Sequence, residues 1–111
     1  MSRKSAKYRA QPTEVDGIRF ASKAEAARYG QLKLLEKAGY IRGLLLQPAF
    51  VLHAPSPSGP VKVGKYVADF AYMADGALVY EDVKGMRTPQ YRWKKKHVEA
   101  EYGIEIREVT R

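Results

Sequence analysis

The segment KYVADFAYMADGALVYEDVKG, residues 65–85, decides the fold of this chain. Two runs of β-forming residues in it flank Asp75-Gly76, a dipeptide that strongly indicates a two-residue hairpin loop. Counted back from that loop along an antiparallel ladder, Asp69 lies directly opposite Asp82. A four-residue loop keeps this register, whereas a three-residue loop breaks it. The sequence therefore predicts two facing carboxylates in one hairpin.

Strand alternation sorts the charged residues of this hairpin onto two faces of the predicted sheet. Asp69, Asp82 and Lys84 share one face, and the same count places Lys84 opposite Val67. Glu81 points to the other face, where we expect it to pair with a cation on a helix. An alternative for the first group is a buried ion cluster that only fixes the register of the sheet.

The remaining elements follow from turn and capping signals. They are a hairpin or turn at 13–20, a helix from the capping box Ser22–Glu25 to Lys37, a buried strand at 43–54 interrupted at Pro48, a loop at 55–60, a helix from Thr88-Pro89 to Tyr102 and a last strand at 104–109. With the hairpin strands at 65–74 and 77–84, the order is α, β, β, β, α, β. We expect an α/β fold in which one mixed sheet is covered by helices.

Composition narrows the class of function. A chain of 111 residues forms one domain, here residues 13–111, behind a basic arm at 1–12 that either contacts phosphates or serves as a solubilising tail. The formal net charge of +8 favours a polyanionic partner such as nucleic acid. The absence of cysteine excludes disulfides, thiolate metal sites and a thiol nucleophile. No apolar run is long enough for a membrane helix, so we expect neither secretion nor membrane insertion.

The facing carboxylates suit a hard divalent ion. Like charges placed so are destabilising unless Lys84, Arg87 or a bound metal neutralises them. Mg²⁺ typically takes one or two carboxylates, with waters and substrate phosphate completing the octahedron, and Asp69 and Asp82 supply that number. Lys84 would place an ammonium beside the metal, where it holds a phosphate oxygen or lowers the pKa of an attacking water. These are the parts of metal-assisted phosphodiester hydrolysis.

A basic run, RTPQYRWKKKH at 87–97, follows the hairpin directly and opens the second helix. A helix N-terminus surrounded by basic residues attracts phosphate through its dipole and free amides. We expect backbone phosphates to be steered to the carboxylates from here, through nonspecific electrostatic contacts. For the individual lysines, the alternative is an ordinary solvated helix face. The candidate nucleic-acid-binding residues are Arg87, Arg92, Lys94, Lys95 and Lys96.

The motif residues ADF at 68–70 and DVK at 82–84, within this order of elements, resemble the PD-(D/E)xK nuclease superfamily. Asp69 matches the first acid, Asp82 the second and Lys84 the lysine, while Ala68 replaces the proline of the motif. The likeness covers residues 13–111 and looks closest to small phage and prophage nucleases of the Holliday-junction-resolvase-like and endonuclease-I-like kinds. It implies a restriction-endonuclease-like core.

The resemblance implies a Mg²⁺-dependent DNA endonuclease, with Mn²⁺ able to take the place of Mg²⁺, acting on branched or replicative DNA in the cytoplasm of a bacterial host. It also implies that Glu25 assists the metal site as a further acid, although the capping box alone accounts for a glutamate there. Gln47, before Pro48, resembles a glutamine-proline of some relatives, and the resemblance implies that it contacts the nucleic acid. Resolvase-like relatives act as dimers, which makes a homodimer an open alternative to a monomer.

An alternative interpretation is based on the positive charge alone and assumes no catalytic activity. It is a non-catalytic basic nucleic-acid-binding protein with an inactive nuclease-like fold, supported by the basic arm and by the aromatic residues among the lysines. Cleavage assays with substituted acids separate the two interpretations.

Overall fold

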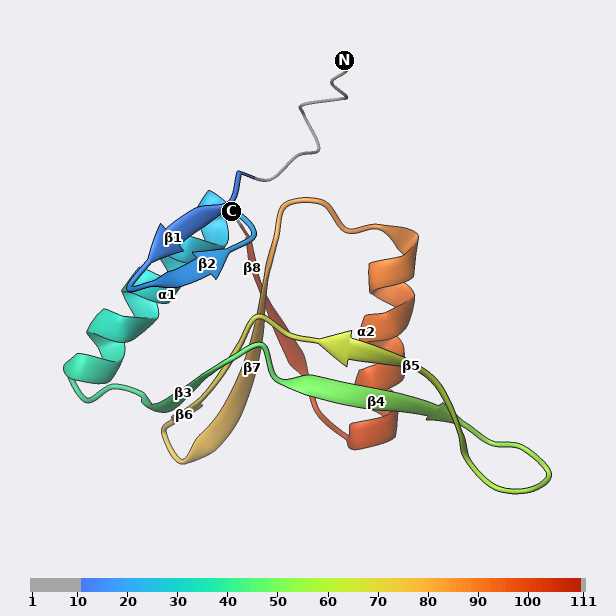
Figure 1. Cartoon of the computed structure of the whole chain (residues 1–111). Coiled ribbons are helices and arrows are strands. Elements are labelled where there is room, and N and C mark those ends of the chain that lie inside the picture. Colours follow the sequence, from blue (N-terminus) through green and yellow to red (C-terminus); the bar gives the residue numbers. More distant parts are fainter. Residues whose placement is uncertain (1–10, 111) are drawn as a thin grey trace, which may run out of the picture.

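A computed structural model describes residues 11–110, so most of the predicted basic arm lies outside the described residues. The described chain is a mixed α and β structure, which confirms the predicted fold class (Figure 1). Its elements in chain order are β1 (Thr13–Val15), β2 (Ile18–Phe20), α1 (Lys23–Lys37), β3 (Arg42–Leu46), β4 (Ala49–Ala54), β5 (Val61–Val67), β6 (Phe70–Ala74), β7 (Ala77–Lys84), α2 (Pro89–Tyr102) and β8 (Ile106–Thr110).

The central hairpin forms as its loop predicts. Asp75 and Gly76 both adopt positive φ, 52° and 76°, as the favoured two-residue hairpin turn requires. The β6–β7 ladder pairs Ala74 with Ala77 at the loop and Phe70 with Glu81 at its far end, so the predicted register is confirmed. Asp69 directly precedes Phe70 and Asp82 directly follows Glu81, so the same register brings Asp69 and Asp82 together.

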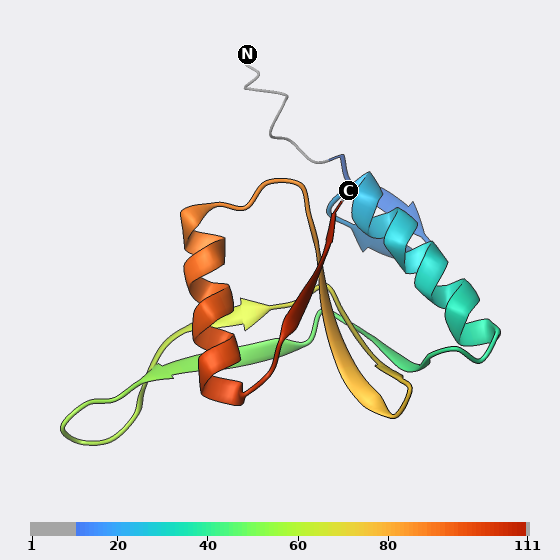
Figure 2. The same ribbon diagram turned by 180° about the vertical axis from the view of Figure 1, so that it is seen from behind.

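The main sheet has four strands in the order β3-β6-β7-β8, with β7 and β8 parallel and the other pairs antiparallel. Helix α1 covers one face and α2 the other (Figures 1 and 2). Each helix closes its own small core on its own face of the sheet. The α1 core includes Leu32, Phe70 and Tyr72, and the α2 core includes Val98 and Ile106.

The predicted mixed sheet forms with four strands, but the long strand pair does not stay in it and bends away at the predicted interruption. Pro48 cannot donate to a ladder and Gln47 adopts φ of 54°, so the predicted buried strand at 43–54 divides into β3 and β4. The facing strand divides at Ala68 and Asp69. Two hydrogen bonds hold the bend together: Gln47 N–H donates to Asp69 O at 3.0 Å, and Ala68 N–H donates to the carbonyl of Pro48 at 3.0 Å.

Beyond the bend, β4 and β5 form a separate two-stranded ribbon that packs against α2 (Figure 1). Val67 therefore pairs with Ala49, and the predicted pairing of Val67 with Lys84 is wrong. The ribbon is also less buried than predicted, since Val51 and Val63 are exposed. It begins at Val61 and not at residue 65, as an antiparallel ribbon needs two strands of matched length.

Both helix starts follow their capping signals. Ser22 Oγ accepts from the Glu25 amide, and Thr88 Oγ1 accepts from the Tyr91 amide, with Pro89 in the first turn of α2. Gly103 ends α2 in the left-handed conformation with φ of 65°. Strand β8 pairs from Ile106, two residues later than predicted, because the chain needs those residues to leave the helix. Within residues 11–110, neither helix is long and apolar enough to span a membrane.

Candidate active site

The predicted pair of acids comes together at the bend. Asp82, 1% exposed, accepts the Asp69 amide at 2.9 Å on Oδ1 and the hydroxyl of Tyr66 on Oδ2. Asp69 in turn accepts the Val83 amide at 2.7 Å on Oδ2. Each carboxylate thus binds a backbone amide of the opposite strand, where the regular ladder ends. This exchange holds the two side chains side by side on a rigid backbone.

Glu25 joins this pair from the first turn of α1. It is 8% exposed, and it lines the same cavity as Asp69. Burial, followed by the charge of Asp69, raises the pKa of Glu25 to about 7. The capping box explains the backbone position of this glutamate, but not the position of its side chain at the cavity. The structure therefore brings all three predicted acids into one neighbourhood.

Asp82 also carries a raised pKa. Burial is the main cause and raises the pKa to about 6, although Lys84 and the Asp69 amide pull it down. The charge of Glu108 also raises the pKa of Asp82, because β8 pairs in parallel with β7 and places Glu108 beside Asp82. The site therefore holds more negative charge than its neighbouring cations offset.

Lys84 follows Asp82 on β7 and is held by an aromatic ring. Its Nζ is 4.2 Å from the centroid of the Tyr91 ring, a cation–π geometry that fixes the ammonium. In the part of the chain that the structure describes, Lys84 forms no ion pair. An ammonium held by a ring keeps its N–H groups for a further oxygen.

A cavity of about 100 Å³ opens beside Glu25 and Asp69. A single water needs roughly 10–15 Å³ of such space, so several waters or a hydrated cation fit. Among residues 11–110, no three His, Cys, Asp or Glu side chains form a group that could hold a metal ion. Two carboxylates with waters are nevertheless an ordinary Mg²⁺ ligand set. The residues that line the cavity are Ile18, Arg19, Phe20, Glu25, Leu46, Gln47 and Asp69.

Besides the two acids, the cavity is lined by two polar residues, Gln47 and Arg19. Gln47, a predicted nucleic-acid contact, reaches it because the bend places its backbone against Asp69. Arg19 reaches it from β2, and sequence reasoning missed it. Alternation in a three-residue strand gives too little signal to say which way Arg19 points.

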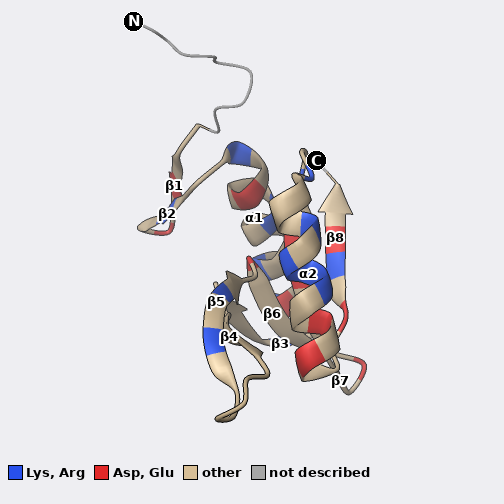
Figure 3. Cartoon of the chain, turned by 90° about the vertical axis from the view of Figure 1, so that its right-hand side faces the viewer, with Lys and Arg blue, Asp and Glu red and all other residues tan. Residues whose placement is uncertain are grey.

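The basic run divides into paired and free cations. Arg87 pairs with Glu108 at 2.8 Å, and Lys95 pairs with Glu99 at 3.4 Å, so these two predicted DNA contacts also serve the fold. Arg92 and Lys96 are exposed on α2. Lys94 lines a second, larger cavity beside β5. Figure 3 shows Lys and Arg on both α2 and β5.

The pair around Arg87 contains residues that sequence reasoning missed. Glu108 accepts Arg87 Nε and the hydroxyl of Tyr91, each at 2.8 Å. Burial and the hydrogen bond to Glu108 raise the pKa of Tyr91, while Arg87 lowers the pKa of Glu108. Tyr66, the donor to Asp82, was missed as well. The parallel register of β8 and the bend at Ala68 and Asp69, after Tyr66, were the missing information.

Glu81 lies on the opposite face, as strand alternation predicts. It is 0% exposed and accepts Arg28 Nε at 2.9 Å and Nη2 at 2.6 Å, together with the hydroxyl of Tyr72. The expected helix cation is therefore Arg28 of α1. A carboxylate satisfied in this way has a structural role, although it is adjacent to Asp82 in the chain.

Comparison with known proteins yields one family. No curated protein and no solved structure matches this chain. One family model matches residues 5–110, nearly the whole chain. The chain belongs to the family described as "Protein of unknown function (DUF1064)".

Proposed function

We propose that this protein is a metal-dependent DNA endonuclease that hydrolyses phosphodiester bonds. The observation that carries the proposal is a pair of crossed hydrogen bonds: Asp82 accepts the Asp69 amide, and Asp69 accepts the amide of Val83, the residue after Asp82. It fixes two carboxylates next to Glu25, with the ammonium of Lys84 close by and unpaired among the described residues. Acids gathered at a site of partial burial, at a cost in repulsion, are typical of functional sites.

Asp69 and Asp82 would hold the metal, and Glu25 would assist through a second ion or a bound water. Mg²⁺, or Mn²⁺ in its place, supplies Lewis acidity toward the phosphate when bound. Lys84 would hold a phosphate oxygen or the attacking water. The water oxygen forms a new bond to phosphorus as the bond to the leaving oxygen breaks. The proton of the water passes to solvent or to Glu25, whose pKa is about 7, and the leaving oxygen takes a proton from a solvent water to become a hydroxyl.

The surrounding charge supports DNA as the substrate. The chain carries a net charge of +8, and Arg92, Lys94 and Lys96 extend from the site along α2. Phosphates are attracted to such a surface without base reading. Branched or replicative DNA, a homodimer with two sites and a bacterial host cytoplasm remain part of the proposal, carried by the resemblance to the PD-(D/E)xK nucleases.

A cleavage assay tests the proposal. Supercoiled plasmid, linear duplex and a four-way junction are incubated with wild-type protein in Mg²⁺, Mn²⁺ or EDTA. We expect cleavage in either metal and none in EDTA. Asp82→Asn and Lys84→Ala should be inactive, whereas Lys62→Ala, a matched exposed lysine on the ribbon, should cut like wild type.

Two outcomes would count against it. Wild type that binds all three DNAs in Mn²⁺ but leaves them intact would favour the non-catalytic nucleic-acid-binding interpretation. Cleavage by Asp82→Asn at the wild-type rate would remove Asp82 from the site.

A further inference from the structure

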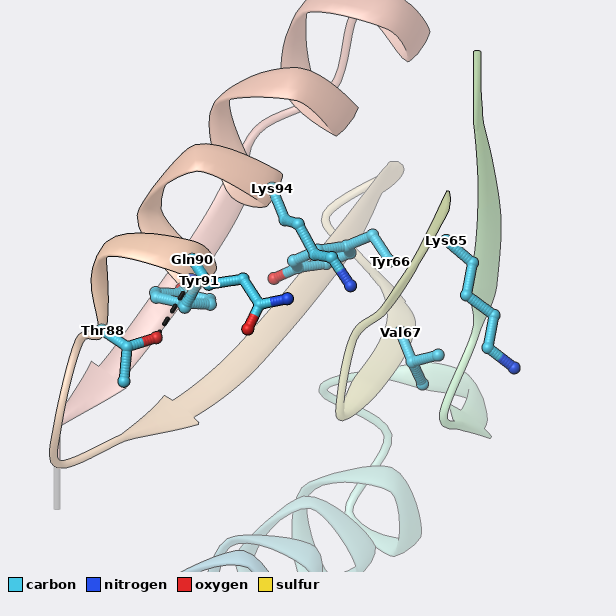
Figure 4. A pocket seen from close by; sticks show the side chains of 7 residues that line it. All are labelled: Lys65, Tyr66, Val67, Thr88, Gln90, Tyr91 and Lys94. Carbon is cyan, nitrogen blue, oxygen red and sulfur yellow. Dashed lines mark hydrogen bonds between the residues drawn. The ribbon is translucent and has the colours of Figure 1, made fainter. Parts of the chain in front are cut away.

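A second cavity, of about 330 Å³, lies between β5 and the first turns of α2. This volume falls at the lower end of the roughly 300–1,000 Å³ typical of small-molecule sites. It lies on the α2 side of Asp82, away from the cavity beside Glu25. Seven residues line it: Lys65, Tyr66, Val67, Thr88, Gln90, Tyr91 and Lys94 (Figure 4).

The lining combines cations with flat apolar surface. It contains two lysines and no acid, in contrast to the smaller cavity, which contains Glu25 and Asp69. In Figure 4 the side chains of Gln90 and Lys94 extend from α2 into the gap on the side of Tyr66 and Val67. An anionic ligand with an aromatic part matches these walls, because lysine attracts phosphate and a tyrosine ring stacks on a base.

The two walls are held at a fixed separation. The far end of the ribbon is tied to the last turns of α2, where Glu101 accepts the His53 amide at 2.7 Å and Tyr102 donates to the Val51 carbonyl at 2.6 Å. Leu52 packs in the same core as Val98 between these ties and the cavity. The cavity is therefore a built gap at the end of a packed interface.

The cavity shares two side chains with the candidate active site. Tyr66, which lines the cavity, donates its hydroxyl to Asp82. Tyr91, which also lines it, carries Lys84 over its ring. A group bound in the cavity would therefore lie one side chain away from the proposed reaction centre.

We propose that this cavity binds one unpaired nucleotide of the DNA, adjacent to the phosphate that is cleaved. The volume of about 330 Å³ is in the range of a ligand the size of one nucleotide. Lys94 would bind the phosphate and the tyrosine wall would contact the base. The inference rests on the proposed nuclease function, because it names the substrate feature that function would select: a flap, a bulge or a junction in place of continuous duplex.

Binding in EDTA tests this inference without any cleavage. Fluorescence anisotropy gives the dissociation constants of a labelled blunt duplex and of the same duplex with one extra unpaired nucleotide. We expect wild type to prefer the second by about tenfold, since stacking of one base is worth about 1–3 kcal/mol. Replacing the extra nucleotide with an abasic residue should abolish most of this preference.

Two substitutions should remove the preference and one should keep it. Val67→Trp fills the cavity and Lys94→Gln removes its cation, and each should bring the two dissociation constants to within about twofold. Lys96→Gln removes an equal charge from the exposed side of α2, so it should weaken both complexes alike and keep their ratio. Circular dichroism and thermal melting establish folding, and Lys94→Gln carries the test if Val67→Trp does not fold.

Equal affinity of wild type for both duplexes would overturn the inference, as would equal ratios for Lys94→Gln and Lys96→Gln. These results are distinct from failure of the nuclease proposal. A protein that prefers the unpaired nucleotide but never cleaves DNA keeps this binding site and loses the catalytic role.

Discussion

Glu81 and Asp82 are adjacent in β7 and almost equally buried, but they differ in their hydrogen-bond and charge partners. Glu81 receives two N–H groups of Arg28 and the Tyr72 hydroxyl. Asp82 receives one backbone amide and one tyrosine hydroxyl, and it has the carboxylates of Asp69 and Glu108 nearby. The same strand thus carries a neutralised acid on its α1 face and an under-neutralised acid on its α2 face.

This difference distinguishes a buried acid with a structural role from a buried acid that is a candidate for the active site. A buried carboxylate is costly unless it is paired, and a fold that needs only register can pair it. The α1 face does so with an arginine. The α2 face leaves Asp82 with a pKa of about 6 and places Lys84 nearby on a tyrosine ring. The proposed active site therefore carries unneutralised negative charge, and the divalent cation of the proposal would offset it.

The largest change that we expect is in the cleavage rate when Asp82 and Glu81 are each replaced by the corresponding amide, because one acid has a proposed catalytic role and the other a structural role. Asp82→Asn should lower the rate of metal-dependent cleavage by at least about 1,000-fold, because loss of a metal ligand removes several kcal/mol of transition-state stabilisation. Glu81→Gln, assayed at a temperature where it is folded, should stay within about tenfold of wild type. Single-turnover cleavage measures both, and equal losses in the two variants would break the comparison.

Stability should respond in the opposite order. Glu81→Gln should lower the free energy of unfolding by about 3 kcal/mol, because it leaves the Arg28 guanidinium without its buried counter-charge. Asp82→Asn should cost less than about 1 kcal/mol at pH 8, where the charge that it removes is unfavourable. Urea unfolding followed by circular dichroism measures both. The double variant Arg28→Met with Glu81→Leu should recover much of the loss, and no recovery would show that the pair does more than neutralise charge.

The central hairpin could be predicted because its signals are local. Asp75-Gly76 sets the loop, the loop sets the register, and the register places Asp69 at Asp82 and sends Glu81 to the other face. Capping signals placed both helices for the same reason. Local signals sufficed wherever the partner was near in sequence.

The bend and its consequences could not be predicted in this way. Pro48 signalled an irregularity in one strand, but the matching break at Ala68 depends on how the facing strand follows it. That break moves Val67 away from Lys84 and turns Tyr66 toward Asp82. Glu108 likewise needed the parallel register of β8, which is set by how α2 returns the chain to the sheet.

Glu25 offers a pH-dependent test of the same charge imbalance. Its pKa rises from 4.5 to about 7 in the folded state, so the folded protein holds this proton more tightly than the unfolded chain. The resulting stability is fully present below about pH 4.5 and is lost as the pH rises through about 7. Glu25→Gln should therefore stabilise the protein by about 1–3 kcal/mol at pH 8 and by almost nothing at pH 4.5.

Unfolding in urea and EDTA at the two pH values measures this difference. Glu14→Gln, an exposed acid on β1, is the control and should change stability equally at both. A Glu25→Gln variant with the same stability gain at both pH values would mean that burial and the charge of Asp69 do not raise the pKa of Glu25 in the folded state.

The smallest expected effect concerns the acid beside Asp82 on β8. Glu108 raises the pKa of Asp82, and Arg87 holds part of that charge in an ion pair at 2.8 Å. Glu108→Gln should therefore lower the pKa of Asp82, so that cleavage falls at a lower pH than in wild type, and Arg87→Gln should move the fall to a higher pH. Each shift should be under about one pH unit, because a partly exposed pair contributes about 0.2–1 kcal/mol. Single-turnover rates between pH 5 and 8 measure the shifts. All variants carry Glu25→Gln as a common background, so that Asp82 titrates in this range and Glu25 does not.

In the double variant of Glu108 and Arg87 the two effects should largely cancel. An Arg87→Gln variant that lowers the rate at every pH without moving the fall would show that Arg87 acts on the DNA phosphate and not on Glu108, and would return it to the nucleic-acid contacts that the sequence predicts.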